Sequence, residues 1–382
     1  MKVSAVYNKD LTDQVLEELS LLLERGFPND SKELWKLRFN FWWIGNPHIS
    51  DDIAVGWILT DDDQKMIDGF MGNIPVLYQI NDEKYLGCSS TSWFVPDEMR
   101  GREGSSMYLW FTRQKMMNIF INTTPSYGVP TILESLGFKK VGEPNLINYM
   151  LIINFTHFIS MMASLLTHFS ESETGFVKKA FILCGKVGCG ISKILPHRKK
   201  GSLHQYTTDG THDIKSCRDS TLFMQYLLEH KRGKTIELSK DKTTLDWMLF
   251  SPEVQALLHR KTEQIFTKEG TYCGYIIYDY QHVGTETILR IRELQLLKPE
   301  NDQIKLIIKH LKIEARNAGC AAIYSGLLAP DPELNKLLHK NISLSLKTKN
   351  RYFVKFRKNV ITDVDPYAIY VPSDLDPDAG FI

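Results

Sequence analysis

The first third of the chain changes from helical to extended spacing of its apolar residues. Leu11 to Arg25 and Ser31 to Phe41 carry apolar residues three and four positions apart, which predicts two helices, the second capped by Ser31. After Pro47 the apolar runs become short and are bounded by turn residues, as in strands. The predicted strands are Ala54 to Thr60, Met66 to Ile80 and Lys84 to Val95.

Helices and strands then alternate up to residue 155. We predict a helix over Ser105 to Asn118, a strand over Ile119 to Asn122, a helix over Val129 to Ser135 and a final strand pair ending at Phe155. Hairpin strands followed by strand–loop–helix–strand units indicate a mixed sheet in an α/β (α+β) domain.

The second half of the chain repeats parts of this pattern. The segment 33–39 has a counterpart in 245–252, and Gly56 to Asp61 has one in Gly274 to Asp279. A strand, a helix and a strand then follow in the same order over 288–327. These matches predict an internal duplication of one fold.

A less regular segment joins the two halves. No charged residue occurs from Pro144 to Ser170, but polar residues are spread through this stretch. We therefore predict a strand over Tyr149 to Phe155 and an amphipathic or buried helix over 157–169, rather than a membrane span, and the helix remains a candidate for contact with a membrane surface. The basic run Lys193 to Lys200 is typical of a solvated linker. The predicted domains are 1–156 and 213–382, with 157–212 as linker helix and basic connection.

Composition excludes several classes of function. At 382 residues the chain is long enough for two domains, and its net charge of +1 provides no overall field for nucleic acid. The six cysteines form no Cys-x-x-Cys pair and the histidines show no His-x-x-x-His spacing, so neither a disulfide framework nor a metal site is expected. Free thiols and an N-terminus without an apolar signal region indicate a cytoplasmic protein.

The segment Val95-Pro-Asp-Glu-Met-Arg-Gly-Arg-Glu-Gly-Ser-Ser106 carries the strongest chemical signal. A strand ends at Val95, a loop rich in Gly and Arg follows, and a helix begins near Ser105. The unpaired N–H groups and positive dipole end of a helix N-terminus attract anions, and small residues let the backbone approach a pyrophosphate. Because the loop contains neither Gly-Lys-Ser/Thr nor Gly-x-Gly-x-x-Gly, it is not a Walker or dinucleotide loop.

This loop resembles motif A of the GNAT acyltransferase superfamily, and Glu134-Ser-Leu-Gly-Phe-Lys-Lys-Val-Gly142 is similar to the segment after the fourth helix of that superfamily. The resemblance covers about residues 1 to 155. It implies that Phe94 and Val95 meet the pantetheine arm of an acyl-CoA, that Asn122 also touches this arm, and that the loop binds the pyrophosphate. The pyrophosphate residues it implies are Arg100, Gly101, Arg102, Glu103, Gly104, Ser105 and Ser106.

The chain departs from the superfamily at two positions. Glu103 stands where a small residue is usual, and Leu133 replaces the tyrosine that protonates the leaving thiolate in many members. Tyr127 is the candidate substitute for that tyrosine, and Ser92 is the candidate for orienting an acceptor amine. The second half has the acidic segment Lys298 to Gln303 at the equivalent place, which is a poor pyrophosphate cradle.

The resemblance predicts a tandem GNAT-type N-acyltransferase with two mixed, mostly antiparallel sheets flanked by helices. It would move an acyl group, acetyl by preference, from acetyl-CoA or another acyl-CoA to a primary amine such as an amino sugar. Neither a metal ion nor a nucleic acid is predicted to take part in the reaction. Two alternatives stay open: a Fem-type aminoacyl transferase, against which the loop 100–106 argues, and an inactive protein that only binds CoA.

Overall fold

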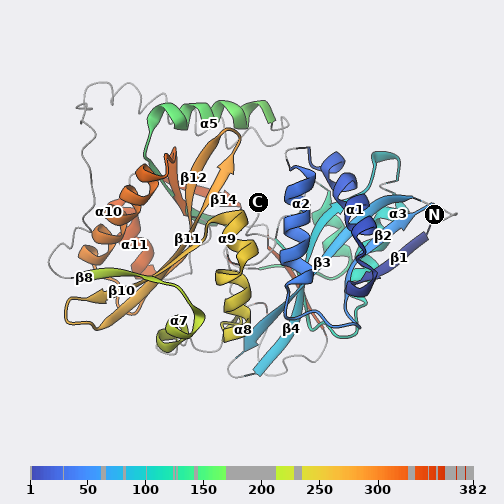
Figure 1. The fold of residues 1–382 in the computed structure, drawn as a ribbon, viewed down its shortest axis with the longest axis horizontal. Helices are drawn as coiled ribbons and strands as arrows, with labels where there is room; N and C mark the ends of the chain where they lie inside the picture. Colours follow the sequence, from blue (N-terminus) through green and yellow to red (C-terminus); the bar gives the residue numbers. More distant parts are fainter. Residues whose placement is uncertain are drawn as a thin grey trace.

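The structure is a computed structural model that describes residues 2–28, 30–61, 66–80, 83–99, 101–123, 125, 128–141, 145–168, 212–227, 235–325, 332–342, 344–349, 352–357, 367 and 375. It consists of two lobes, each built on one sheet (Figure 1). Helices α2 and α9 lie between the two sheets.

The first sheet has the strand order β1-β2-β3-β4-β5-β15-β6, and β9 extends it beside β3. Only β4 and β5 pair in parallel, so the predicted mixed, mostly antiparallel sheet is confirmed. Its strands are β1 (Lys2–Tyr7), β2 (Ala54–Thr60), β3 (Ile67–Ile80), β4 (Glu83–Phe94), β5 (Ile119–Asn122), β6 (Lys139–Lys140), β9 (Ile236–Leu238) and β15 (Phe353–Phe356).

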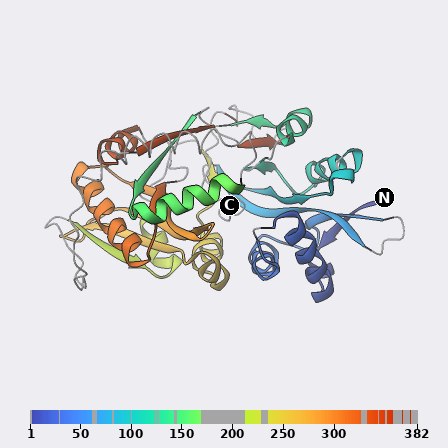
Figure 2. The same cartoon turned by 90° about the horizontal axis from the view of Figure 1, so that it is seen from above.

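Helices cover both faces of this sheet (Figure 2). One face carries α1 (Asp13–Gly26), α2 (Lys32–Phe39) and the π-helical turn η2 (Asn40–Ile44); the other carries α3 (Arg102–Thr112) and α4 (Val129–Ser135). Short turns η1 (Asn8–Asp10) and η3 (Asp97–Met99) precede α1 and α3. Ser31 caps α2 as predicted, because its Oγ accepts a hydrogen bond from the Leu34 amide at 3.3 Å.

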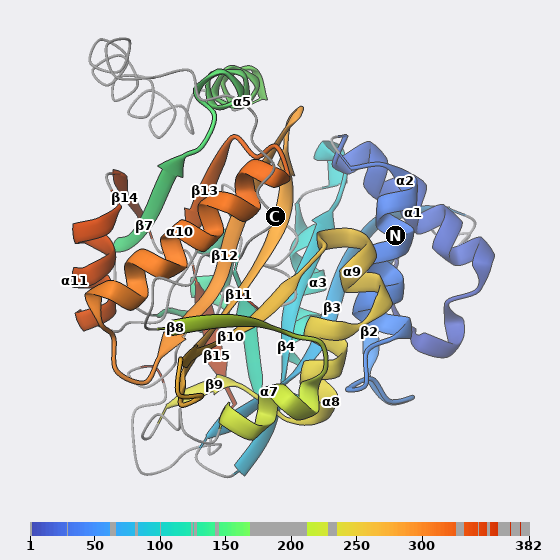
Figure 3. The same ribbon diagram turned by 60° about the vertical axis from the view of Figure 1, so that its left-hand side comes forward.

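The second sheet has the order β14-β7-β13-β12-β11-β10-β8 (Figure 3). Its strands are β7 (Asn145–Ile152), β8 (His212–Cys217), β10 (Lys261–Thr267), β11 (Tyr272–Val283), β12 (Glu286–Leu296), β13 (Ala322–Ser325) and β14 (Leu344–Lys349). Helices α10 (Asn301–Asn317) and α11 (Pro332–Asn341) pack on one face. The other face carries α7 (Ser220–Leu227), α8 (Lys242–Leu245), the π-helical turn η5 (Asp246–Phe250) and α9 (Pro252–Leu258).

The two sheets match strand for strand, which confirms the predicted duplication. When the second order is read from β8 and the first from β1, the fourth and fifth strands of each pair in parallel, and every other described pair is antiparallel. The sequence matches, however, were out of register. Gly56 lies in β2, the second strand of its order, whereas Gly274 lies in β11, the third; similarly, Trp247 of η5 corresponds to a residue of η2 and not to Trp35.

The two halves exchange strands: β7 of the first half joins the second sheet, and β15 and β9 of the second half join the first sheet. The strand pair expected to close the first domain does not form there, because β7 pairs with β13 and β14 in the second sheet. The place left beside β5 is taken by β15 from the end of the chain, which pairs with β5 and β6. Each sheet therefore contains at least one strand whose sequence belongs to the other half, and the first sheet contains two, β9 and β15.

Aromatic stacking joins the lobes at the counterpart turns η2 and η5. The rings of Phe41 and Trp247 stack with centroids 5.0 Å apart, and Trp247 Nε1 donates to the Phe41 carbonyl at 2.8 Å. Nearby, Lys84 Nζ lies 2.6 Å from Asp241 Oδ2. One hydrophobic core runs through this interface, so the lobes are packed together and not merely tethered.

The tryptophans and the apolar helix behave as core elements. Trp35, Trp42, Trp43 and Trp57 are all buried, which favours their prediction as core. Helix α5 (Phe155–His168) follows β7 as predicted and buries Phe158 and two methionines, while its described outer positions are polar or small. No helix in the described part of the chain is long and apolar enough to cross a membrane.

A buried charge cluster holds the second lobe together. Asp279 Oδ2 accepts hydrogen bonds from Arg260 Nη2 at 2.9 Å and from Arg292 Nε at 2.8 Å, and all three side chains are almost fully buried. Arg260 Nη1 also donates to the Met248 carbonyl of η5 at 2.8 Å. The carboxylate thus neutralises guanidinium groups that link β10, β11, β12 and η5.

Replacing Asp279 with Ala should destabilise the protein strongly. Removing one partner of a buried ion pair leaves the other charge uncompensated and typically costs about 3–5 kcal/mol. Chemical denaturation should show this loss, whereas Asp302→Ala, which removes an exposed pair with Lys305, should change the unfolding free energy by less than about 1 kcal/mol. Equal effects of the two substitutions would contradict the assigned role of Asp279.

The strand exchange predicts that a fragment of residues 1–156 does not fold alone. Its β7 would lack both partners, and the edge of β5 that β15 covers would be exposed, which favours aggregation. Size-exclusion chromatography and circular dichroism measure this outcome. Co-expression of residues 1–170 with 171–382 retains all the exchanged strands and should yield a soluble complex. A monomeric, cooperatively folded 1–156 fragment would contradict the prediction.

Candidate functional site

Strands β4 and β5 separate part of the way along their length. They pair in parallel only from Gly87 to Ser89, after which β5 ends and β4 continues to Phe94. The pairing of β4 with β3 shifts at the same place, and Ser92 there has a φ of +50°. A positive φ is uncommon for a residue other than glycine, and such backbone strain with a bulge is concentrated at functional sites.

Helix α3 begins beside this split, three residues earlier than predicted. Gly101 is its N-cap, no side chain caps it, and its first backbone bond runs from the Ser105 amide to the Gly101 carbonyl at 3.3 Å. The amides before Ser105 therefore lie in the first turn, where a helix has no internal acceptors for them. A Cβ on Gly104 would lie 3.3 Å from the Met99 carbonyl oxygen, so the glycine allows tight closure of the loop.

Three polar side chains meet on the α3 side of the split, and we call them the split cluster: Ser90, Tyr108 and Asn122. Asn122 Nδ2 donates to Ser90 Oγ at 2.8 Å and to the Tyr108 hydroxyl at 3.0 Å. Ser90 Oγ in turn donates to the Ile121 carbonyl at 3.3 Å. All three residues are buried, so the cluster has fixed geometry and little competing water.

Two buried polar atoms on the α3 side of the split have no hydrogen-bond partner within the described part of the chain. They are Asn122 Oδ1 and Trp93 Nε1. Buried polar atoms are normally paired, so two orphaned ones at one place are best explained by a missing partner. An acceptor and a donor match the N–H and C=O groups of the amides in pantetheine. The orphaned atoms therefore fit a pantetheine arm.

The opposite side of the split is filled with aromatic rings. The Phe94 ring faces Phe27 with centroids 6.4 Å apart, and Trp43 packs edge-on against Phe70 at 5.6 Å. The packing is tight enough that a Cβ on Gly26 would overlap the Phe94 ring. The described side chains on this face thus leave little room beside the bulge.

The structure brings most of the predicted site residues to one place. Ser92, Phe94 and Val95 lie at the end of β4 and Asn122 at the end of β5, while Gly101, Gly104, Ser105 and Ser106 form the start of α3. Arg102 and Glu103 open α3, and only their backbone is described; Arg100 and Tyr127 lie outside the described residues.

Ser90 and Ser92 would share a face in a regular strand, but they do not do so here. The bulge resets the alternation of β4, so Ser90 joins the split cluster while Ser92 Oγ lies 3.2 Å from Thr91 Oγ1. Trp93 and Tyr108 were not among the predicted site residues. Tyr108 lies in the second turn of the helix that follows the glycine loop. This position in the sequence is the feature from which its place near the site could have been predicted.

Cys88 and Leu133 are unsuited to acid–base or nucleophilic chemistry. Burial raises the pKa of the Cys88 thiol well above its usual value, so the thiol stays protonated. Leu133 is fully buried in α4 among apolar neighbours and has no proton to donate. The position that resembles the tyrosine of the superfamily therefore supplies only packing.

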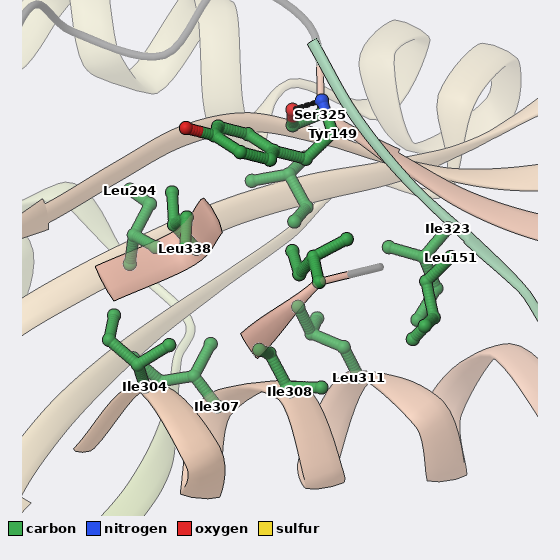
Figure 4. Close-up of a pocket in the computed structure, with 12 residues that line it drawn as sticks. Tyr149, Leu151, Leu294, Ile304, Ile307, Ile308, Leu311, Ile323, Ser325 and Leu338 are labelled. Carbon is green, nitrogen blue, oxygen red and sulfur yellow. Dashed lines mark hydrogen bonds between the residues drawn. The ribbon is translucent and has the colours of Figure 1, made fainter. Parts of the chain in front are cut away.

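The equivalent place in the second lobe, the start of α10, borders a cavity of about 490 Å³ lined by Lys298, Glu300 and Gln303, but it is acidic. Helix α10 is capped by Glu300, whose side chain accepts from the Gln303 amide, so a carboxylate already occupies the first turn. Where the first lobe has its split cluster, the second has an apolar cavity of about 20 Å³, with Tyr149 and Ser325 at its rim (Figure 4). Their hydrogen bond, from the Tyr149 amide to Ser325 Oγ at 2.7 Å, closes that rim. The start of α10 thus differs from the start of α3 by a carboxylate that already accepts from one of its first-turn amides.

Comparisons with known proteins give structural matches alone. No protein-family model and no curated protein sequence matches the chain. Saccharomyces cerevisiae N-myristoyltransferase with bound myristoyl-CoA superposes with a TM-score of 0.56 at 12% identity, over 100% of this chain and 84% of that one.

Two further solved structures are similar. A probable N-acyltransferase of Enterococcus faecalis gives a TM-score of 0.54 at 11% identity, over 93% of this chain and 72% of that one. A GCN5-related N-acetyltransferase from Anabaena variabilis gives 0.51 at 10% identity with the same coverage, 93% and 72%. With the two matching sheets and the β4–β5 split, these similarities show that the chain has the two-domain fold of GNAT-type N-acyltransferases.

Proposed function

We propose that this protein is an N-acyltransferase that moves a short acyl group from acyl-CoA, bound in the first lobe, to a primary amine. The observation that carries the proposal is the set of orphaned polar atoms at the β4–β5 split, beside an uncapped helix N-terminus. These two features suit the two distinctive parts of CoA, the amide-containing pantetheine arm and the pyrophosphate.

In the proposed binding mode, the pyrophosphate rests on the first-turn amides of α3 that precede Ser105, from Gly101 to Gly104. The pantetheine arm passes through the split, with Asn122 Oδ1 accepting from one of its N–H groups and Trp93 Nε1 donating to one of its carbonyls. Phe94 and Val95 line the same path. The thioester then lies near the bulge at Ser92.

The proposed reaction is direct transfer. The amine loses a proton to a base or to water, and its nitrogen attacks the thioester carbon while the carbonyl π pair moves to oxygen. Backbone N–H groups at the end of β4 stabilise that oxyanion. The C–S bond then breaks, the carbonyl re-forms, and the CoA thiolate takes a proton. An amino sugar or another small amine is the acceptor class we favour.

The aromatic packing beside the bulge supports an acetyl group over a long chain. A Cβ on Gly72 would lie 2.7 Å from Thr91 Cγ2 and 3.2 Å from the Trp43 ring, so the described side chains at this place are closely packed and leave little space for methylene groups. Accommodating a longer acyl group would require displacing rings that are buried at 0% exposure, such as Trp43 and Phe70.

A CoA-binding protein without turnover is the second candidate function. The buried Leu133 in place of a proton donor is the observation that favours it. The two candidates differ in whether thiol is released when acetyl-CoA and a panel of amines are supplied.

Replacing Gly104 with Asp should abolish most of the CoA affinity. The substitution places a carboxylate in the first turn of α3, where it repels the pyrophosphate, and we expect affinity to fall at least about tenfold in calorimetric titration with acetyl-CoA. The matched control is Asn301→Asp, which adds the same charge to the first turn of α10, the counterpart helix, and should leave CoA affinity unchanged. No binding by the wild type would sink the proposal.

Competition against labelled CoA tests the acyl chain length. If a channel buried a myristoyl chain, each methylene would add about 0.8 kcal/mol, and myristoyl-CoA would bind far more tightly than acetyl-CoA. We expect no such gain. Phe94→Ala should open space beside Gly26 and raise affinity for hexanoyl-CoA, whereas Phe158→Ala in α5 should not. A myristoyl-CoA affinity more than a hundredfold (about 2.7 kcal/mol) above that of acetyl-CoA would refute the short-chain assignment.

A further inference from the structure

The geometry points to Tyr108 as the group that protonates the departing CoA thiolate, an assignment that rests on the proposed function. The position that resembles the proton-donating tyrosine of the superfamily holds Leu133, so any proton donor must come from elsewhere. Among the described residues, Tyr108 is the ionisable side chain that belongs to the split cluster.

Tyr108 is held rigidly on the CoA side of the split. It lies in the second turn of α3, is 2% exposed, and its ring packs edge-on against Trp93 and Phe111 at 5.1 and 6.4 Å. Its hydroxyl points to the end of β5, where Asn122 Nδ2 lies 3.0 Å away. A pantetheine arm that passes between β4 and β5 must therefore pass this hydroxyl.

Asn122 connects the hydroxyl to the expected position of the sulfur. Both hydrogens of its Nδ2 are used, one for Ser90 Oγ and one for Tyr108, which leaves Oδ1 as the buried atom that lacks a donor. The pantetheine N–H nearest the thioester would supply that donor. Because only two methylene groups separate this N–H from the sulfur, the sulfur lies within reach of the Tyr108 hydroxyl.

The same contact makes Tyr108 a suitable acid. When the C–S bond breaks, its electron pair stays on sulfur; the sulfur takes the hydroxyl proton, and the negative charge moves to the phenolate oxygen. Asn122 Nδ2 already donates to that oxygen and stabilises the charge. The phenolate regains a proton from the one released by the acceptor ammonium, so the cycle balances.

The test measures the thiol of CoA bound to the full chain and needs no acceptor. The pKa of the bound thiol is read from the ultraviolet absorbance of the thiolate as the pH is raised. A hydroxyl that donates to the sulfur stabilises the thiolate, so we expect this pKa to lie below that of free CoA. Tyr108→Phe, which keeps the ring, should raise it by about one unit while CoA affinity changes by less than about threefold.

The matched control is Tyr149→Phe, which removes a buried hydroxyl in the second lobe that donates to the Asn335 carbonyl. It should leave the bound thiol unchanged. A bound thiol that titrates alike in the wild type, Tyr108→Phe and Tyr149→Phe would overturn the assignment while leaving the acyltransferase proposal intact. Failure of the wild type to bind CoA would overturn the acyltransferase proposal itself.

The wild type alone provides a second criterion if Tyr108→Phe does not fold. Bound CoA whose thiol pKa equals or exceeds that of free CoA would show that no donor faces the sulfur, and the assignment of Tyr108 would be rejected. A lowered pKa that is unaffected when CoA is replaced by dephospho-CoA would support it, because the contact with the hydroxyl involves only the sulfur end of the molecule.

Discussion

Strand β7 completes the second sheet beside β13, and strand β15 completes the first sheet beside β5. Without these strands, the backbone groups along one side of β13 and of β5 would be unpaired. This exchange fixes the two lobes to each other. Together with the Phe41–Trp247 stack, it gives the first lobe a rigid frame in which β4 can continue past the end of β5 without fraying. The split at the candidate site therefore depends on a strand from the far end of the chain.

The two lobes share one architecture but differ in the chemistry of the corresponding positions. In the first, the β4–β5 split is lined by polar atoms and faces an uncapped helix N-terminus. In the second, a carboxylate caps α10 and aliphatic side chains fill the corresponding interior. The Glu300 carboxylate accepts from a first-turn amide of α10 and would repel a pyrophosphate there. The start of α10 is therefore unsuited to the ligand proposed for the start of α3.

The parts of the site that were predictable are those set by local backbone chemistry. A strand end, a glycine-rich loop and a helix start can be recognised from Val95, Gly101 and Gly104, and at Gly104 a side chain would approach the Met99 carbonyl closely. Tyr108 could not be predicted as a site residue in the same way. Its relation to Asn122 arises because α3 folds back under β4, which brings together side chains 14 positions apart.

The sequence alone predicted most helices and strands of the first half, the duplicated plan and an anion-binding loop at 95–106, because hydrophobic spacing and glycine positions act over short range. Only the tertiary structure decided which strands pair, how Gly56 and Gly274 align in their sheets, and where β7 belongs. Strand pairing depends on which backbone edges are buried across the whole molecule. The apolar pattern of residues 145–152 predicts a strand but does not indicate which sheet the strand joins.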